Sequence, residues 1–127
     1  MKATTTLPFQ EAINRVTEEL KREGFGVLTD IDVQETLKKK LNVDFRKYRI
    51  LGACNPPTAF RALENEIDIG LMLPCNVIAY EAGGQQTVVA AIDPVASMMA
   101  VHNEALGEHA QEIRRRLKHV IEAIEKG

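Results

Sequence analysis

Two cysteines lie in short stretches with similar neighbours, and they are the side chains best able to carry out chemistry. Cys54 opens a Cys-Asn-Pro tripeptide, and Cys75 is the middle residue of a Pro-Cys-Asn tripeptide. A thiolate is a strong nucleophile, and two neighbouring thiols can exchange electrons by forming and breaking a disulfide. The sequence therefore contains two candidate catalytic thiols but does not name a reaction.

Each cysteine also has a purely structural explanation. Cys54 precedes a predicted helix, and the positive end of a helix would lower the pKa of a thiol, although Pro56 and Pro57 each remove one amide donor. Cys75 shares the two-residue alternation of Val77, which predicts that it faces the core. Packing as a small buried side chain is the alternative for both. If their strands are neighbours, the two thiols could meet across the sheet.

Three polar residues near the cysteines are candidate binding residues. Asn55 is well placed to cap a helix, and the start of that helix is suited to a small anion or metabolite. Asn76 is unusual inside a strand, so its side chain either holds the backbone beside Pro74 or faces a ligand. Glu81 ends an apolar strand and could serve as a general base if partly buried, or could simply mark where the strand reaches water.

Metal and cofactor sites have little support in the sequence. Cys54, Cys75, Glu81 and His102 are suitable zinc ligands, but they lack the close spacing of a strong zinc site, so we assign no metal ligand and keep a metal site as a minor variant of the thiol hypothesis. His102 and His109 would lie roughly 10 Å apart along a helix and could not share one ion. No phosphate loop, dinucleotide fingerprint, nucleophile elbow or HExxH motif is present, so the cofactor stays unknown.

Composition limits the classes of partner. The 127 residues are 45% hydrophobic, and 16 basic against 18 acidic residues give a net charge of −2, which argues against a general nucleic-acid binder. No apolar run approaches the roughly 18 residues that a membrane span needs, and no signal-peptide pattern is present. Two cysteines in such a chain are expected to be reduced thiols. We therefore expect a cytoplasmic protein without membrane or nucleic-acid partners.

Residue types and periodicity predict five strands, over residues 2–7, 25–30, 48–54, 71–81 and 87–92. Helices are predicted between them, and residues 95–101 predict a short helical turn. Typical capping residues mark the helix ends: Pro8 and Gly24 for the first helix, Asp32 for the second, Asn55 for the third and Asn103 for the last. The Gly83-Gly84 pair predicts a hairpin between the last two strands.

These elements predict one α+β domain over residues 1–127, with about five strands in a partly antiparallel sheet and helices packed on one face. Pro74 cannot donate a hydrogen bond to a neighbouring strand, so its strand is at an edge, bulged, or regular only beyond the proline. The sheet face without helices needs a cover, and a homodimer would supply one.

The same stretches resemble a known family. The residues that carry the resemblance are Cys54-Asn55-Pro56, Ala59, Leu63, the run from Gly70 to Val77, Tyr80-Glu81 and Asp93-Pro94. They are similar to the pattern of the family catalogued as domain of unknown function 302, and the resemblance extends over nearly the whole chain. It implies a small α+β protein that is cytoplasmic and able to dimerise, with no established activity. The matching motif positions are Cys54, Asn55, Pro74, Cys75, Asn76 and Glu81.

Three functional hypotheses remain open. The first is a binding module for a small, anionic ligand, with Asn55, Asn76 and Glu81 as its binding residues. The second is thiol-dependent redox or sulfur chemistry at Cys54 and Cys75, and the third is a structural homodimer without catalysis. The sequence does not decide whether the protein is an enzyme.

Overall fold

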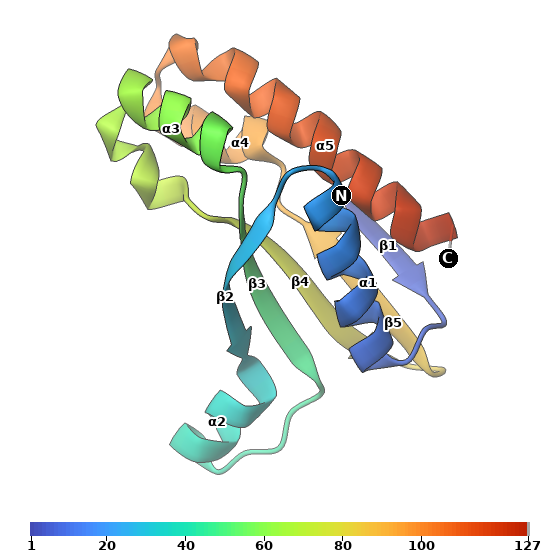
Figure 1. Ribbon diagram of the computed structural model, residues 1–127. Helices are drawn as coiled ribbons and strands as arrows, with labels where there is room; N and C mark the ends of the chain where they lie inside the picture. Colours follow the sequence, from blue (N-terminus) through green and yellow to red (C-terminus); the bar gives the residue numbers. More distant parts are fainter. Residues whose placement is uncertain (127) are drawn as a thin grey trace.

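The computed structural model describes residues 1–126, which form an α+β domain with one five-stranded sheet. The strands follow the order β1-β5-β4-β3-β2, and each pairs with its neighbours in antiparallel fashion. Helices α1 and α5 lie side by side across one face of this sheet (Figure 1). The predicted fold class is confirmed, and the sheet is antiparallel throughout.

The strands begin and end close to the predicted positions, with one exception. Their bounds are β1 Lys2–Thr5, β2 Gly26–Asp32, β3 Tyr48–Cys54, β4 Cys75–Ala82 and β5 Gln86–Ala91. The exception is β4, which we predicted to begin at residue 71. Leu71 and Met72 instead belong to a 3-10 helix, η1, at Ile67–Met72. Leu71 is 83% exposed there and does not continue the inward alternation of the strand.

Local capping determines where most helices begin. The helices are α1 Phe9–Arg22, α2 Val33–Leu41, α3 Pro56–Asn65, α4 Pro94–Met98 and α5 Gly107–Lys126, with further 3-10 helices η2 Met99–Val101 and η3 Glu104–Leu106. Asp32 accepts a hydrogen bond from the backbone of Glu35, as its capping pattern predicts. Asn103 caps η3 rather than α5, because its side chain accepts from the backbone N–H of Ala105.

Pro74 lies just before the central strand of the sheet. The peptide between Leu73 and Pro74 is cis, and regular pairing of β4 starts at the next residue, so the strand is regular only beyond its proline. Pro74 packs over Gly52 of β3. A Cβ atom at Gly52 would lie 2.7 Å from the Cγ of Pro74 and would clash with Oγ1 of Thr29. Only glycine therefore fits beneath this pair without movement.

The main core lies between the sheet and the two long helices. Inward residues such as Leu51, Val77 and Val89 pack in one cluster with Leu20 of α1 and Leu117 of α5. A second, smaller cluster joins the upper helices beyond the end of the sheet. Its buried members are Ala62, Ile69, Met98, Leu106 and Ala110. The two clusters together position every helix except α2, none of whose residues is buried.

The opposite face of the sheet carries no helix (Figure 1). We call it the open face, and two rows of mutually paired residues define it. The rows are Ile31, Ile50, Ile78 and Ala90, and then Tyr48, Tyr80 and Val88. The rings of Tyr48 and Tyr80 stack with centroids 5.5 Å apart. The middle of the open face is thus apolar, as the centre of an interface would be, whereas polar residues such as Thr29 and Asn76 lie towards one end of the same face.

Within the described part of the chain, no helix combines the length and apolar character needed to cross a membrane.

Candidate functional site

The two candidate thiols come together at one end of the sheet. Strands β3 and β4 are neighbours, and Ala53, directly before Cys54, is the register partner of Cys75. Both cysteines are free thiols; Cys54 is half-buried, and Cys75 is buried with 5% exposure. Their side chains contribute to the wall of the same small cavity. The inward direction expected for Cys75 is confirmed.

This thiol cavity is small and almost entirely apolar. Its volume is about 20 Å³, which is room for roughly one water molecule. The residues that line it are Phe25, Ala53, Cys54, Asn55, Thr58, Ala59, Ala62, Leu73, Cys75, Met98, His109 and Ile113. No metabolite fits beside the sulfur atoms unless one of these side chains moves.

Burial keeps both thiols protonated near neutral pH. It raises the pKa of Cys75 to about 11, and the nearby Cys54 thiol adds to this effect. Burial also raises the pKa of Cys54 above its ordinary value of 9.0. Of the two alternatives for Cys54, a pKa lowered by the helix start and a small packed side chain, the direction of the pKa supports the second. Neither sulfur is an activated nucleophile in this conformation.

The start of α3 has no free amide donor for an anion. Pro56 and Pro57 occupy the first two positions and lack an N–H group. The N–H of Thr58 donates to Oδ1 of Asn55 at 3.2 Å, and the N–H of Ala59 donates to the carbonyl oxygen of Asn55 at 2.9 Å. Asn55 is the predicted cap, and the donors that would hold an anion are absent or occupied.

The other two predicted binding residues lie away from the thiols. Asn76 pairs with Gly52 and is exposed, and because side chains alternate along a strand it faces the open side while Cys75 faces the core. Glu81 is exposed near the far end of β4, six positions from Cys75 and thus roughly 20 Å away along the strand. The structure brings Cys54, Asn55 and Cys75 together and separates Asn76 and Glu81 from them.

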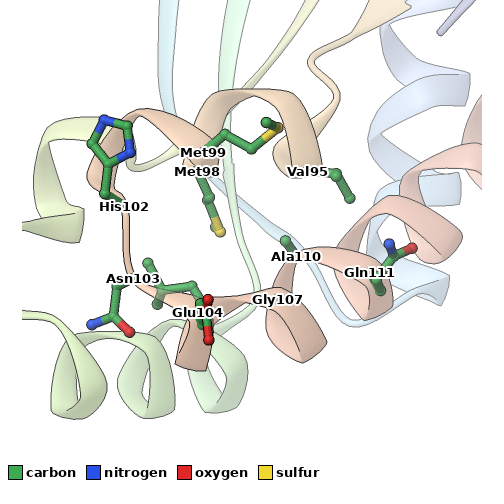
Figure 2. A pocket seen from close by; sticks show the side chains of 10 residues that line it. Val95, Met98, Met99, His102, Asn103, Glu104, Gly107, Ala110 and Gln111 are labelled. Carbon is green, nitrogen blue, oxygen red and sulfur yellow. The ribbon is translucent and has the colours of Figure 1, made fainter.

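A much larger hollow lies next to the thiol cavity. This α4–α5 groove has a volume of about 500 Å³, within the range typical of small-molecule sites. Its lining residues are Val95, Met98, Met99, His102, Asn103, Glu104, Leu106, Gly107, Ala110 and Gln111. Figure 2 shows α4 and η2 along one side of it, and η3 and the start of α5 along the other. Apolar side chains dominate its floor, with a polar group at several points of the rim.

Two sets of interactions hold the walls of the groove in place. Asp93 caps α4 by accepting from the N–H of Val95 at 3.0 Å, and it also accepts from Nε of Arg114 on α5 at 3.1 Å. At the other end, the amide of Asn103 donates to the carbonyl oxygen of Asn65 and to Oε1 of Glu66, both at 3.2 Å. The groove is therefore anchored to both α5 and α3.

The sequence analysis did not single out Met98, and it considered His109 only as a possible metal ligand. Met98, which is 6% exposed, lines both the groove and the thiol cavity, so its side chain forms part of the partition between them. His109 lines the thiol cavity, and its Nε2 lies 2.9 Å from Nδ2 of Asn65. The position of His109 was detectable, because it is three residues after Leu106 and four before Ile113 on the inward stripe of the last helix.

Metal-binding side chains do not gather at either hollow. Over residues 1–126, no group of three or more His, Cys, Asp or Glu side chains is arranged to hold a metal ion. Cys54 and Cys75 share a cavity, whereas Glu81 lies near the opposite end of the sheet and His102 lies on the groove.

Residues 1–124 match the family model described as "Domain of unknown function DUF302". The fold is similar to the crystal structure of an uncharacterized conserved DUF302 protein from Bacillus stearothermophilus, with a TM-score of 0.90 and 33% sequence identity. That similarity covers 98% of this chain and 96% of the other. No curated protein matches the sequence. The resemblance noted in the sequence is confirmed, and the chain belongs to the DUF302 family.

Proposed function

We propose that this protein is a binding module for a small, largely apolar molecule held in the α4–α5 groove. The observation that carries the proposal is a groove of about 500 Å³ with an apolar floor and a mixed polar rim. Concave sites of this size with a few polar groups on an apolar surface are the usual form of a small-molecule site. The neighbouring thiol cavity, at about 20 Å³, cannot hold such a ligand alone.

The chemistry of the rim favours a ligand that is not strongly charged. His102, Glu104 and Gln111 supply both donors and acceptors around the groove, whereas the Asn103 side chain is occupied by Asn65, Glu66 and Ala105. An anion at the start of α3 has less support than the sequence suggested, because that helix has no free amide donor there. We therefore place the proposed ligand site at the groove and no longer at Asn76 and Glu81. Asn55 lines the neighbouring thiol cavity and caps α3.

Met98 connects this site with the thiols. A methionine side chain has several rotatable bonds and repacks at low cost, so a ligand pressing on the floor of the groove would move it first. Displacement of Met98 would join the groove to the cavity that Cys54 and Cys75 line. The bound molecule would then reach the sulfur atoms.

A thermal-shift screen of apolar fragments with hydrogen-bonding groups tests the proposal. A Cβ at Gly107, on the groove wall, would meet no atom within 4 Å, so Gly107→Trp fills the groove without disturbing the core. Gly70 is equally unobstructed and lies outside the groove, which makes Gly70→Trp the matched control. Ligands should raise the melting temperature of the native protein and of Gly70→Trp, but not of Gly107→Trp. Equal shifts in all three proteins would place the binding elsewhere.

A second candidate function is reversible disulfide formation between Cys54 and Cys75. It is favoured by one observation, that both thiols line a single cavity. With hydrogen peroxide as oxidant, the two thiols would give up two protons and two electrons, and the peroxide would become two molecules of water. Mass spectrometry should then detect the loss of two hydrogen atoms per chain. Separate oxygen additions at one or both sulfurs, with no crosslink, would argue against it.

We also propose that the protein is a homodimer in the cytoplasm. The support for the dimer is the open face, where a row of Ile31, Ile50 and Ile78 crosses three strands without any covering helix. Ile31 is 49% exposed in the single chain. The hydrophobic face of a sheet is normally buried against another layer, and a second copy would supply that layer. The two free thiols suit a reducing compartment.

A further inference from the structure

We propose that the exposed apolar side of the α2 arm, residues 33–47, packs on the partner protomer of this homodimer. The inference rests on the homodimer proposed above and goes further by assigning a role to one segment. The arm comprises α2 and the connection from α2 to β3, and it extends away from the layered body beyond the end of the sheet (Figure 1).

The arm lacks the packing that a helix needs within one chain. None of the nine residues of α2 is buried. Its apolar stripe consists of Val33, Leu37 and Leu41, and Leu41 at its end is 65% exposed. A helix of this length is not stable by propensity alone and depends on burying its apolar side. Val33 and Leu37 are half-buried against the chain's own strands, so the single chain buries that side only in part and leaves its far end exposed.

The end of the arm lies beside the open face. Val43 and Phe45, which follow α2, are each 43% exposed. The ring of Phe45 lies 6.3 Å from that of Tyr48, which stacks in turn on Tyr80. A line of aromatic rings therefore connects the sheet to the residues that follow α2, so a partner that covers the sheet would meet the arm as well.

The area left exposed matches that of one interface. The chain exposes 7539 Å², whereas a compact monomer of 14.1 kDa would expose about 6,700 Å². The excess of about 800 Å² equals the area that each partner buries in a standard protein interface. The excess reflects the protruding arm, and its size is of the order that a second copy of the chain buries in one interface.

Charge on the arm favours a second copy over a polyanion. Lys38 and Lys39 belong to a basic run, but Lys38 pairs with Asp44 at 3.1 Å and Lys39 pairs with Glu35 at 2.6 Å. These contacts neutralise much of the run within the arm itself. Twofold symmetry would place each apolar arm beside the open face of the other copy, and each would cover what the other leaves exposed.

Sedimentation velocity over a range of concentrations tests the inference with three variants. Leu41→Asp changes the arm, and Ile78→Lys changes the centre of the open face. Leu71→Asp is the matched control, because Leu71 is an apolar residue with 83% exposure on η1, outside both surfaces. Circular dichroism should show that each variant keeps its fold.

We expect the native protein and Leu71→Asp to form dimers of equal affinity. Leu41→Asp should raise the dimer dissociation constant at least about tenfold, because symmetry places two copies of the change in the interface. If Ile78→Lys breaks the dimer while Leu41→Asp leaves its affinity unchanged, the homodimer stands and the role of the arm is overturned. A native protein that stays monomeric at all concentrations would overturn both.

Discussion

The raised pKa of Cys75 predicts a specific loss of stability in alkali. Its thiol has a pKa of about 11 in the folded protein, against an ordinary value of 9.0 for an exposed thiol. A group whose pKa is higher in the folded state contributes stability that is complete below the unfolded value and lost as the pH rises through the folded value. The contribution of Cys75 should therefore be complete below pH 9 and should decline between about pH 9 and 11.

The size of the loss follows from the two values. At about pH 10 most unfolded chains would carry a thiolate at position 75, whereas most folded chains would still carry a thiol. One pKa unit corresponds to about 1.4 kcal/mol, so the folded state should lose roughly 1 to 2 kcal/mol by that pH. This change is large enough to measure against the 5–15 kcal/mol that stabilises a typical domain.

Urea unfolding of the native protein and of Cys75→Ala, at about pH 7 and pH 10, isolates this effect. Lysines and tyrosines also titrate in this range, but they are common to both proteins and cancel in the comparison. The native protein should lose roughly 1 to 2 kcal/mol more than Cys75→Ala between the two pH values. Equal losses would mean that Cys75 has an ordinary pKa and that burial does not raise it.

Four further predictions use other features of the structure. Gly52→Ala should lower the free energy of unfolding by about 1 to 3 kcal/mol, because its Cβ has no room, and a urea midpoint equal to the native value would contradict this. Asn55→Ala should cost about 1 kcal/mol in the same assay, since it removes the side-chain cap of α3, whereas Asn55→Asp should keep most of that stability. The hydrogen bond from Arg49 lowers the pKa of Asp30, so the native protein should lose stability as the pH falls below 3.8. Asp30→Asn should lack this part of the acid-induced loss of stability. Met98→Ala should speed alkylation of the buried thiol by iodoacetamide, whereas Met99→Ala, which alters only the groove, should leave the rate unchanged.

Features of the fold that depend on local sequence were predictable. The bounds of β3 agree at both ends, and the caps at Asp32 and Asn55 form as expected, because a cap involves residues only three positions apart. The strand order was not predictable, since it depends on pairing between segments distant in sequence. The start of β4 was misplaced because the apolar residues before Pro74 continue its alternation, although they fold as a 3-10 helix.

The candidate site was only partly predictable, for two different reasons. Cys54 and Cys75 could be suspected from their residue types, and their shared cavity follows from the pairing of β3 with β4. The lack of an anion site at the start of α3 was predictable, because Pro56 and Pro57 have no N–H group to donate. The groove could not be predicted from the sequence, because its lining residues converge only when α4 packs against α5.

The position of β4 divides the proposed activities between the two sides of the sheet. Cys75 and Asn76 are adjacent in sequence, yet one faces the helices and the other faces the open side. A ligand in the groove would act on the helix side through Met98, whereas a partner protomer would act on the opposite side through Ile78 and its neighbours. The two events share only the backbone of the sheet, in which β4 pairs with a strand on each side. Ligand binding and dimerisation should therefore be separable by mutation, and a variant with a blocked groove should still dimerise.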